Sequence, residues 1–99
     1  MLIERGFDVH YDDDMGLIYA SEKGYIDIVK LLVKNGANID ANDDSPFMEA
    51  VRNGKYDVVK FLIKKRSDVY SNIGSAIKIS KKNNHLKLYN YLKKFNTKK

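Results

Sequence analysis

Three consecutive acidic residues, Asp12-Asp13-Asp14, are the first group in the chain whose side chains could bind a metal ion. A calcium-binding loop, however, needs ligands at alternating positions, a glycine in the middle of the loop and a glutamate near its end. None of these follows Asp14 at the required spacing. Acidic residues near the start of a helix interact favourably with the helix dipole. We therefore predict that Asp12, Asp13 and Asp14 cap a helix and that the chain binds no metal.

The residue types of catalytic and cofactor sites are sparse elsewhere in the chain. There is no cysteine, so a zinc site would need the two distant histidines, His10 and His85, together with carboxylates. No glycine-rich phosphate loop, pair of catalytic carboxylates or nucleophile–histidine arrangement is present. We expect a non-enzymatic protein without a cofactor.

Basic residues gather at one end of the chain. Residues 73–99 contain eight lysines and no acidic residue, whereas residues 1–72 contain 10 lysines and arginines against 13 acidic residues. Aromatic residues alternate with some of these lysines: Lys87, Tyr89, Tyr91, Lys93, Lys94 and Phe95. A basic segment with aromatic residues can bind nucleic acid or an anionic surface, or it can simply keep the uncovered face of a terminal repeat soluble.

The elements that must position these residues are set by an internal repeat. Residues 24–41, GYIDIVKLLVKNGANIDA, return thirty positions later as GKYDVVKFLIKKRSDVYS. Identity at a fixed period indicates stacked structural repeats. A third copy is recognisable from Asn84. A fourth, shorter one has Leu2, Gly6, Val9 and Asp12 at matching positions, so we expect the chain to begin within a repeat.

Each repeat is predicted to begin with a short helix. In the middle copy, Ser45-Pro46 is a helix-start signal, and the helix is expected to run from Pro46 to about Asn53. Gly54 then stands where a residue in the left-handed conformation would end the helix, and Asn84 holds the same place in the last copy.

A second helix is predicted over about Asp57 to Lys65. Its polar residues form one narrow stripe and the rest of its surface is apolar, as expected for a helix buried between neighbours on both sides. The equivalent positions of the last copy place Tyr89 and Leu92 in the core.

These features together resemble the ankyrin repeat over nearly the whole chain. Ser45-Pro46-Phe47-Met48-Glu49-Ala50 takes the place of the family's Thr-Pro-Leu-His-x-Ala segment. Further residues match the family's spacing in the middle copy (Gly54, Val58, Val59 and Leu62), in the first copy (Leu17, Ala20, Gly24, Gly36 and Ala37) and in the last copy (His85, Leu88 and Leu92).

The chain departs from the family pattern in several ways. Its period is thirty residues instead of about 33, and the missing residues belong to the β-hairpin finger, which we expect to be clipped. The family's histidines are replaced by Ile18, Met48 and Lys78, so their hydrogen bonds between repeats are not expected. Arg66 replaces a glycine expected at positive φ, at a cost of about 1 kcal/mol. Short repeats of this composition are similar to those of giant DNA viruses.

The resemblance implies an all-α fold, an ankyrin-repeat solenoid of stacked helix-turn-helix units with short turn fingers. We expect a single domain over residues 1–99. Its predicted divisions are a partial repeat (1–12), two repeats (13–42 and 43–72) and a degenerate C-terminal capping repeat (73–99). About three units is near the lower limit for such an array, so we expect marginal stability, with residues 1–14 unfolding first.

The resemblance also implies a function, because ankyrin repeats bind protein partners through a concave face lined by the first helices and through the turn tips. The exposed first-helix positions are Tyr19, Glu22, Lys23, Glu49, Arg52, Asn53, Ile79, Lys82 and Asn83. The turn positions are Asp12, Asp13, Asp14, Asn42, Asp43 and Asp44. We expect a protein-binding module in which Tyr19 and Ile79 are the main contacts. The alternative is binding to nucleic acid or an anionic surface through the lysine-rich last repeat.

We expect a monomer inside the cell, in the cytoplasm, or in the host cytoplasm if the protein is viral. Glu4, Arg5 and Asp8 interrupt the apolar run that a signal peptide needs. No apolar stretch approaches the length of about 20 residues that spans a membrane.

Overall fold

The computed structural model describes residues 11–65 and 72–96. Within these residues the protein is all-α, without a strand. The helices are α1 (Tyr11–Lys23), α2 (Ile26–Lys34), α3 (Ala41–Arg52), α4 (Tyr56–Lys65), α5 (Ile73–Lys82), α6 (Leu86–Lys93) and the short 3-10 helix η2 (Lys94–Asn96). The strain expected at Arg66 lies outside the described residues, as does the predicted partial repeat except for its last two residues.

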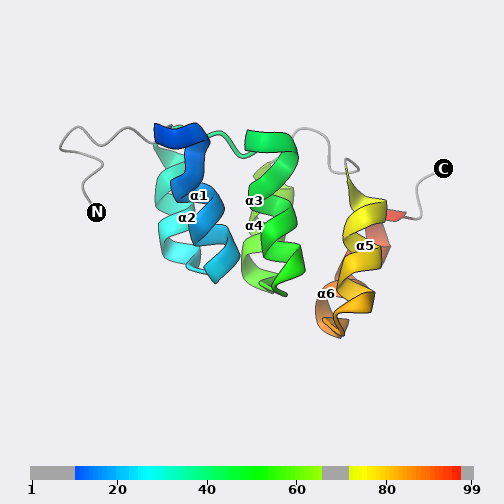
Figure 1. The fold of residues 1–99 in the computed structure, drawn as a ribbon. Coiled ribbons are helices and arrows are strands. Elements are labelled where there is room, and N and C mark those ends of the chain that lie inside the picture. Colours follow the sequence, from blue (N-terminus) through cyan, green and yellow to red (C-terminus); the bar gives the residue numbers. More distant parts are fainter. Residues whose placement is uncertain (1–10, 66–71, 97–99) are drawn as a thin grey trace.

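The described helices form antiparallel pairs that stack along one direction (Figure 1). The first helices α1, α3 and α5 stand in one row, and the second helices α2, α4 and α6 stand behind them. Each first helix starts at the same edge of the stack, and each second helix returns to that edge. The molecule is elongated, with extents of 43 × 25 × 18 Å. The predicted all-α repeat fold is confirmed.

The three first helices end in the same way. Gly24, Gly54 and Asn84 follow them with φ values of 77°, 67° and 61°. The next residue in each case donates its N–H to a carbonyl oxygen five residues earlier: Tyr25 to Ala20 at 2.9 Å, Lys55 to Ala50 at 2.8 Å and His85 to Ser80 at 2.8 Å. This hydrogen-bond pattern requires a left-handed residue after the helix. The predicted left-handed conformation of Gly54 and Asn84 is confirmed.

Helix α3 begins earlier than the sequence predicts. We expected it to start at Pro46, but its helical residues begin at Ala41. The N–H of Asp44 closes this first turn by donating to the carbonyl oxygen of Asp40 at 3.2 Å, and Asp44 itself has a φ of 67°. The left-handed residue separates this turn from the regular helix. Pro46, which has no N–H to donate, is tolerated because it lies at the start of the regular part.

A hydrogen bond joins the starts of α3 and α5. Asn72, the residue before α5, has a φ of 61°, and its Nδ2 donates to Oδ2 of Asp44 at 2.7 Å. Asp44 is only 6% exposed, so this contact helps to satisfy a carboxylate that would otherwise be costly to bury. Two left-handed residues at the same edge of neighbouring repeats are thereby held together.

Six residues that we expected at projecting turn tips lie in helices instead. The acidic run Asp12, Asp13 and Asp14 is in the first turn of α1, and Asn42, Asp43 and Asp44 are in the first turn of α3. The connection from α2 to α3 covers only residues 35–40 and contains no strand. A thirty-residue repeat leaves no length for a hairpin, so the chain enters the next helix directly. Clipped fingers were rightly expected, but placing these six residues at turn tips was wrong.

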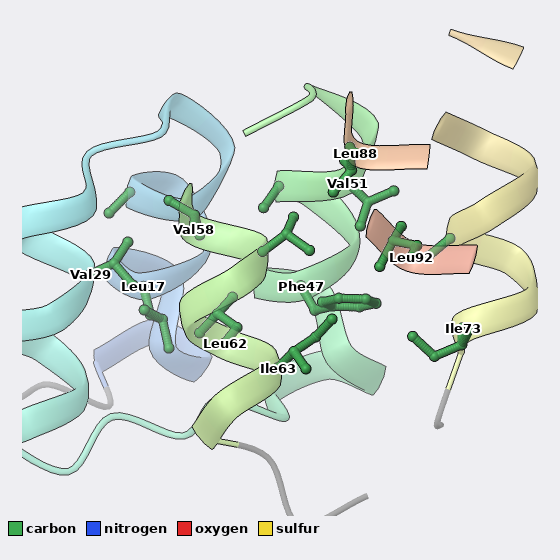
Figure 2. Close-up of a cluster of buried hydrophobic side chains, with 14 of the residues drawn as sticks. Leu17, Val29, Phe47, Val51, Val58, Leu62, Ile63, Ile73, Leu88 and Leu92 are labelled. Atoms are coloured by element: carbon green, nitrogen blue, oxygen red, sulfur yellow. The ribbon is translucent and has the colours of Figure 1, made fainter. Parts of the chain in front are cut away.

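The hydrophobic core lies between the helix pairs (Figure 2). Helix α4 buries Val58, Val59, Leu62 and Ile63, whereas α2 and α6 bury two residues each. Phe47 of α3 is 1% exposed and is the largest fully buried side chain. Helix α4 has neighbours on both sides, so the prediction that the middle second helix is buried from two directions is confirmed.

We predict that Gly54→Ala destabilises the protein more than Gly36→Ala. Both glycines have positive φ, 67° and 95°, so alanine costs about 1 kcal/mol of backbone strain at each. A Cβ at Gly54 would also lie 2.5 Å from Nδ1 of His85, whereas nothing lies within 4 Å of one at Gly36. Urea denaturation should show a further loss of about 1–2 kcal/mol for Gly54→Ala. Equal losses would contradict a tight contact with His85.

A second stability prediction concerns Ser21, which is fully buried and whose Oγ has no hydrogen-bond partner among the described residues. Replacing a buried, unsatisfied hydroxyl by hydrogen should raise the free energy of unfolding by about 1 kcal/mol in Ser21→Ala. Ser80 is the control, because it is equally buried but its Oγ donates to the carbonyl oxygen of Ile77 at 3.0 Å. Ser80→Ala should not stabilise the protein. Thermal denaturation of both variants measures the difference.

Candidate functional site

The residues predicted to contact a partner lie along the row of first helices. We call the exposed side of α1, α3 and α5 the first-helix face (Figure 1). The nine predicted residues fall in the later turns of these helices or directly after them: Tyr19, Glu22, Lys23, Glu49, Arg52, Asn53, Ile79, Lys82 and Asn83. Each is exposed or partly exposed. The repeat therefore places equivalent side chains at the same height on neighbouring helices.

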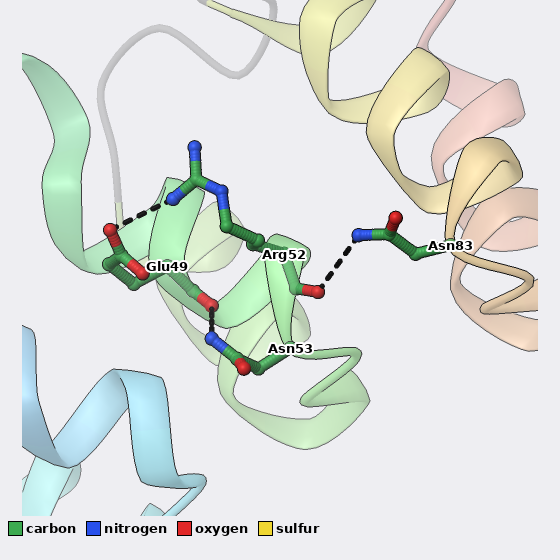
Figure 3. Close-up of polar contacts among 4 residues, drawn as sticks. All are labelled: Glu49, Arg52, Asn53 and Asn83. Atoms are coloured by element: carbon green, nitrogen blue, oxygen red, sulfur yellow. Dashed lines mark hydrogen bonds and ion pairs between the residues drawn. The ribbon is translucent and has the colours of Figure 1, made fainter.

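Glu49 and Arg52 form an ion pair on the surface of α3 (Figure 3). Nη1 of Arg52 donates to Oε2 of Glu49 at 2.8 Å, and the two side chains are 49% and 32% exposed. An exposed pair of this kind contributes less than about 1 kcal/mol to stability. A partner can therefore displace either side chain at little cost.

Two of the predicted contact residues, Asn53 and Asn83, donate hydrogen bonds from their side-chain amides to backbone carbonyl oxygens (Figure 3). Nδ2 of Asn53 donates to the carbonyl oxygen of Glu49 at 2.9 Å and so caps its own helix. Nδ2 of Asn83 donates across the repeat boundary to the carbonyl oxygen of Arg52 at 3.2 Å. Nε2 of His85 lies 3.1 Å from the same oxygen. Asn83 and His85 thus supply contacts between repeats that we did not expect in the absence of the family's histidines.

An exposed apolar cluster surrounds Tyr19. Tyr19 is 53% exposed, and its ring meets the ring of Tyr25 edge to face, with centroids 6.4 Å apart. Nζ of Lys23 lies 5.6 Å from the centroid of the Tyr19 ring. Met15, 45% exposed, lies one turn before Tyr19 on the same side of α1. We name Met15, Tyr19, Lys23 and Tyr25 the tyrosine cluster.

Sequence reasoning missed Met15 and Tyr25 as members of this cluster. The signal for Met15 was its spacing of four residues from Tyr19, which puts both on one helix face. Tyr25 follows the left-handed Gly24 and so returns toward the end of α1, a position that helical spacing alone does not indicate.

Ile79 does not join Tyr19 in one patch. Tyr19 is on α1 and Ile79 on α5, with α3 between them (Figure 1). Ile79 is partly buried and packs against the core. The apolar part of the first-helix face is therefore concentrated on the first described repeat.

A second aromatic group lies on the opposite row and joins α4 to α6 and η2. The ring centroids of Tyr56 and Tyr91 are 5.5 Å apart, and those of Tyr91 and Phe95 are 5.4 Å apart, both edge to face. Nζ of Lys87 lies 4.3 Å from the centroid of Tyr56, and Nζ of Lys94 lies 4.9 Å from that of Tyr91. Burial, together with the neighbouring Tyr56, raises the pKa of the Tyr91 hydroxyl above its ordinary value.

The aromatic residues of the last repeat are poorly placed for stacking on bases. Tyr91 and Phe95 pack against the core. Tyr89 was predicted to be a core residue, but it is only partly buried, because no described helix pair covers the outer side of α6. Nζ of Lys81 and Nζ of Lys93 lie 6.0 Å and 4.9 Å from its ring centroid. Lysines therefore compete with any base for the ring of Tyr89.

Among the side chains that the structure describes, no three from His, Asp or Glu are grouped closely enough to hold a metal ion. Over residues 11–65 and 72–96, every helix is too short or too polar to cross a membrane.

The fold is a stack of antiparallel helix pairs in which each first helix ends in the same way, at a left-handed residue. A family model described as ankyrin repeats (3 copies) matches residues 1–73. The chain belongs to the ankyrin-repeat family. Comparisons with curated proteins and with solved structures found no match. Ankyrin repeats are generally protein–protein interaction modules, and the family is typically non-enzymatic.

The raised pKa of Tyr91 predicts a pH dependence of stability. Because folding favours the protonated hydroxyl, its stabilising contribution is complete below the ordinary pKa of 10.0 and is lost as the pH rises through the higher pKa of the folded state. The free energy of unfolding should therefore fall less steeply above pH 10.0 in Tyr91→Phe than in the wild type. Urea denaturation at a series of alkaline pH values measures both slopes. Identical slopes would show that Tyr91 is not responsible.

Proposed function

We propose that this protein is a non-enzymatic module that binds a protein partner through the first-helix face, which corresponds to the concave face of the ankyrin family. The observation that carries the proposal is the tyrosine cluster. Tyr19 and Tyr25 are 53% and 47% exposed. A tyrosine that serves only to pack a core is usually more deeply buried than this. Exposed aromatic side chains are enriched where proteins bind one another.

The geometry of the cluster favours binding over simple exposure. The edge-to-face contact restrains both rings before any partner arrives. A tyrosine loses little conformational freedom on binding, and one that is already restrained loses less. Met15 adds a flexible side chain that can fit an irregular surface. Lys23 covers part of the Tyr19 ring and can swing aside at small cost, because it is exposed.

Charged residues on the neighbouring helices form a polar rim for this cluster. Arg52 on α3 and Lys82 on α5 are both exposed, one and two repeats along the same face. A partner that covers the tyrosine cluster and extends along the row would meet these cations next. Rim charges of this kind mainly speed association and select the partner.

The last repeat is a weaker candidate for the main site. Its lysines suit an anionic ligand, but the rings that would stack on bases are packed against the core or approached by lysines. The first-helix face is therefore the better candidate for the main site. It carries the exposed aromatic residues, and it corresponds to the face with which the ankyrin family binds proteins.

The proposal predicts that Tyr19→Ala/Arg52→Ala/Lys82→Ala loses a protein partner that the wild type captures. Removing an aromatic residue at the centre of an interface typically costs 2 kcal/mol or more, about thirtyfold in affinity. Affinity purification from a lysate, followed by titration of the purified partner against both proteins, measures the loss.

The control variant removes one exposed apolar residue and two exposed cations from the second helices: Leu86→Ala/Lys34→Ala/Lys65→Ala. It should bind the same partner with wild-type affinity, since these residues lie on the opposite row. If the control loses the partner while the first-helix variant keeps it, the proposed face is wrong.

A further inference from the structure

A groove lies on the opposite side of the stack from the first-helix face, between α2 and α4. It is open and encloses about 310 Å³. Residues of both helices line it: Ile26, Lys30, Asp57, Lys60, Phe61 and Lys64. We name it the α2–α4 groove. Its volume is near the lower end of the range for ligand pockets, so it suits a side chain or two of an extended ligand better than a large cofactor.

The charge of the groove is predominantly positive. Three lysines line it against one carboxylate, that of Asp57. In the described part of the chain, no carboxylate lies within ion-pair distance of Lys30, Lys60 or Lys64. The ammonium groups of Lys30 and Lys60 lie 6.0 Å and 5.8 Å from the ring centroids of Phe61 and Tyr56, but no described carboxylate competes for them. All three groups can therefore pair with an anionic ligand, and they reinforce one another because they line one groove.

The floor of the groove is apolar. Ile26 and Phe61 are partly buried and pack against the core, so their positions are fixed by the stack. Each still reaches the groove surface. An apolar side chain of a ligand would gain contact area here without reorganising the protein. The groove thus combines an apolar floor with a cationic wall.

The same contacts disfavour nucleic acid as the ligand. Nζ of Lys30 and Nζ of Lys65 lie 6.0 Å and 5.6 Å from the centroid of the Phe61 ring. A base would need the whole face of the ring and would have to displace both lysines, whereas an aliphatic side chain needs only part of that face. A continuous phosphate backbone would also have to pass the carboxylate of Asp57. A peptide backbone has N–H groups that can donate a hydrogen bond to this carboxylate, and a phosphate backbone has none.

We propose that the α2–α4 groove binds an acidic segment of a partner protein, one in which carboxylates alternate with aliphatic side chains. Carboxylates of the segment pair with Lys30, Lys60 and Lys64, and an aliphatic side chain rests on Ile26 and Phe61. This surface is separate from the first-helix face. The protein can therefore hold two partners, or two parts of one partner, at the same time.

The test is calorimetric titration of the full chain with two synthetic peptides, one of glutamate and leucine and one in which serine replaces each leucine. The leucine peptide should bind more tightly. Lys60→Gln/Lys64→Gln should weaken it about fivefold, as expected for the loss of two charge contacts at the surface. The control Lys78→Gln/Lys81→Gln removes the same charge from exposed positions of α5 that lie outside both proposed sites, and it should leave the affinity unchanged.

Three outcomes would overturn the proposal. If the groove and control variants weaken binding equally, net charge alone attracts the peptide. If the two peptides bind with equal affinity, the apolar floor does not contribute to binding. Tighter binding of a single-stranded oligothymidine, weakened by Lys60→Gln/Lys64→Gln, would assign the groove to nucleic acid. Amide shifts in nuclear magnetic resonance spectra of the wild type locate the peptide without any variant. They should centre on Ile26 and Phe61, and a centre on Tyr19 would place the peptide on the first-helix face instead.

Discussion

The stack depends on how closely one repeat can approach the helix end of the repeat before it. Nδ1 of His85 lies only 2.5 Å from the place a Cβ of Gly54 would occupy, and the side chain of Lys55 comes within 2.8 Å of the corresponding place at Gly24, one repeat earlier. Only a residue that has no Cβ and accepts positive φ fits both requirements. The approach lets His85 and Asn83 reach the carbonyl oxygen of Arg52, so the same contact joins the repeats through hydrogen bonds.

Burial in this fold follows from neighbours, since no helix pair has a core of its own. Val59 and Ile63 of α4 are buried because helix pairs stand on both sides. At the equivalent positions of α6, Tyr89 is partly buried and Lys93 is exposed. The last repeat thus keeps the helices and the helix end of the others but presents a polar outer side.

The two rows of helices divide the surface into faces of different chemistry. The first helices carry the tyrosine cluster at one end, and their charged residues are partly held by short-range pairs such as Glu49–Arg52. The second helices carry a lysine stripe, and several of its ammonium groups rest over aromatic rings, as that of Lys87 does over Tyr56. One scaffold thus presents two faces that differ in chemistry.

The sequence by itself determined the repeat, the pairing of helices and the left-handed ends at Gly54 and Asn84, because these depend on residue types at fixed local spacing. It also named the exposed positions of the first helices. It could not tell that the amide of Asn83 is engaged by the neighbouring repeat, nor that Tyr25 joins Tyr19. The α2–α4 groove and the hydrogen bond from Asn72 to Asp44 escaped it for the same reason. Each arises from atoms of separate segments that only the tertiary structure brings within contact distance.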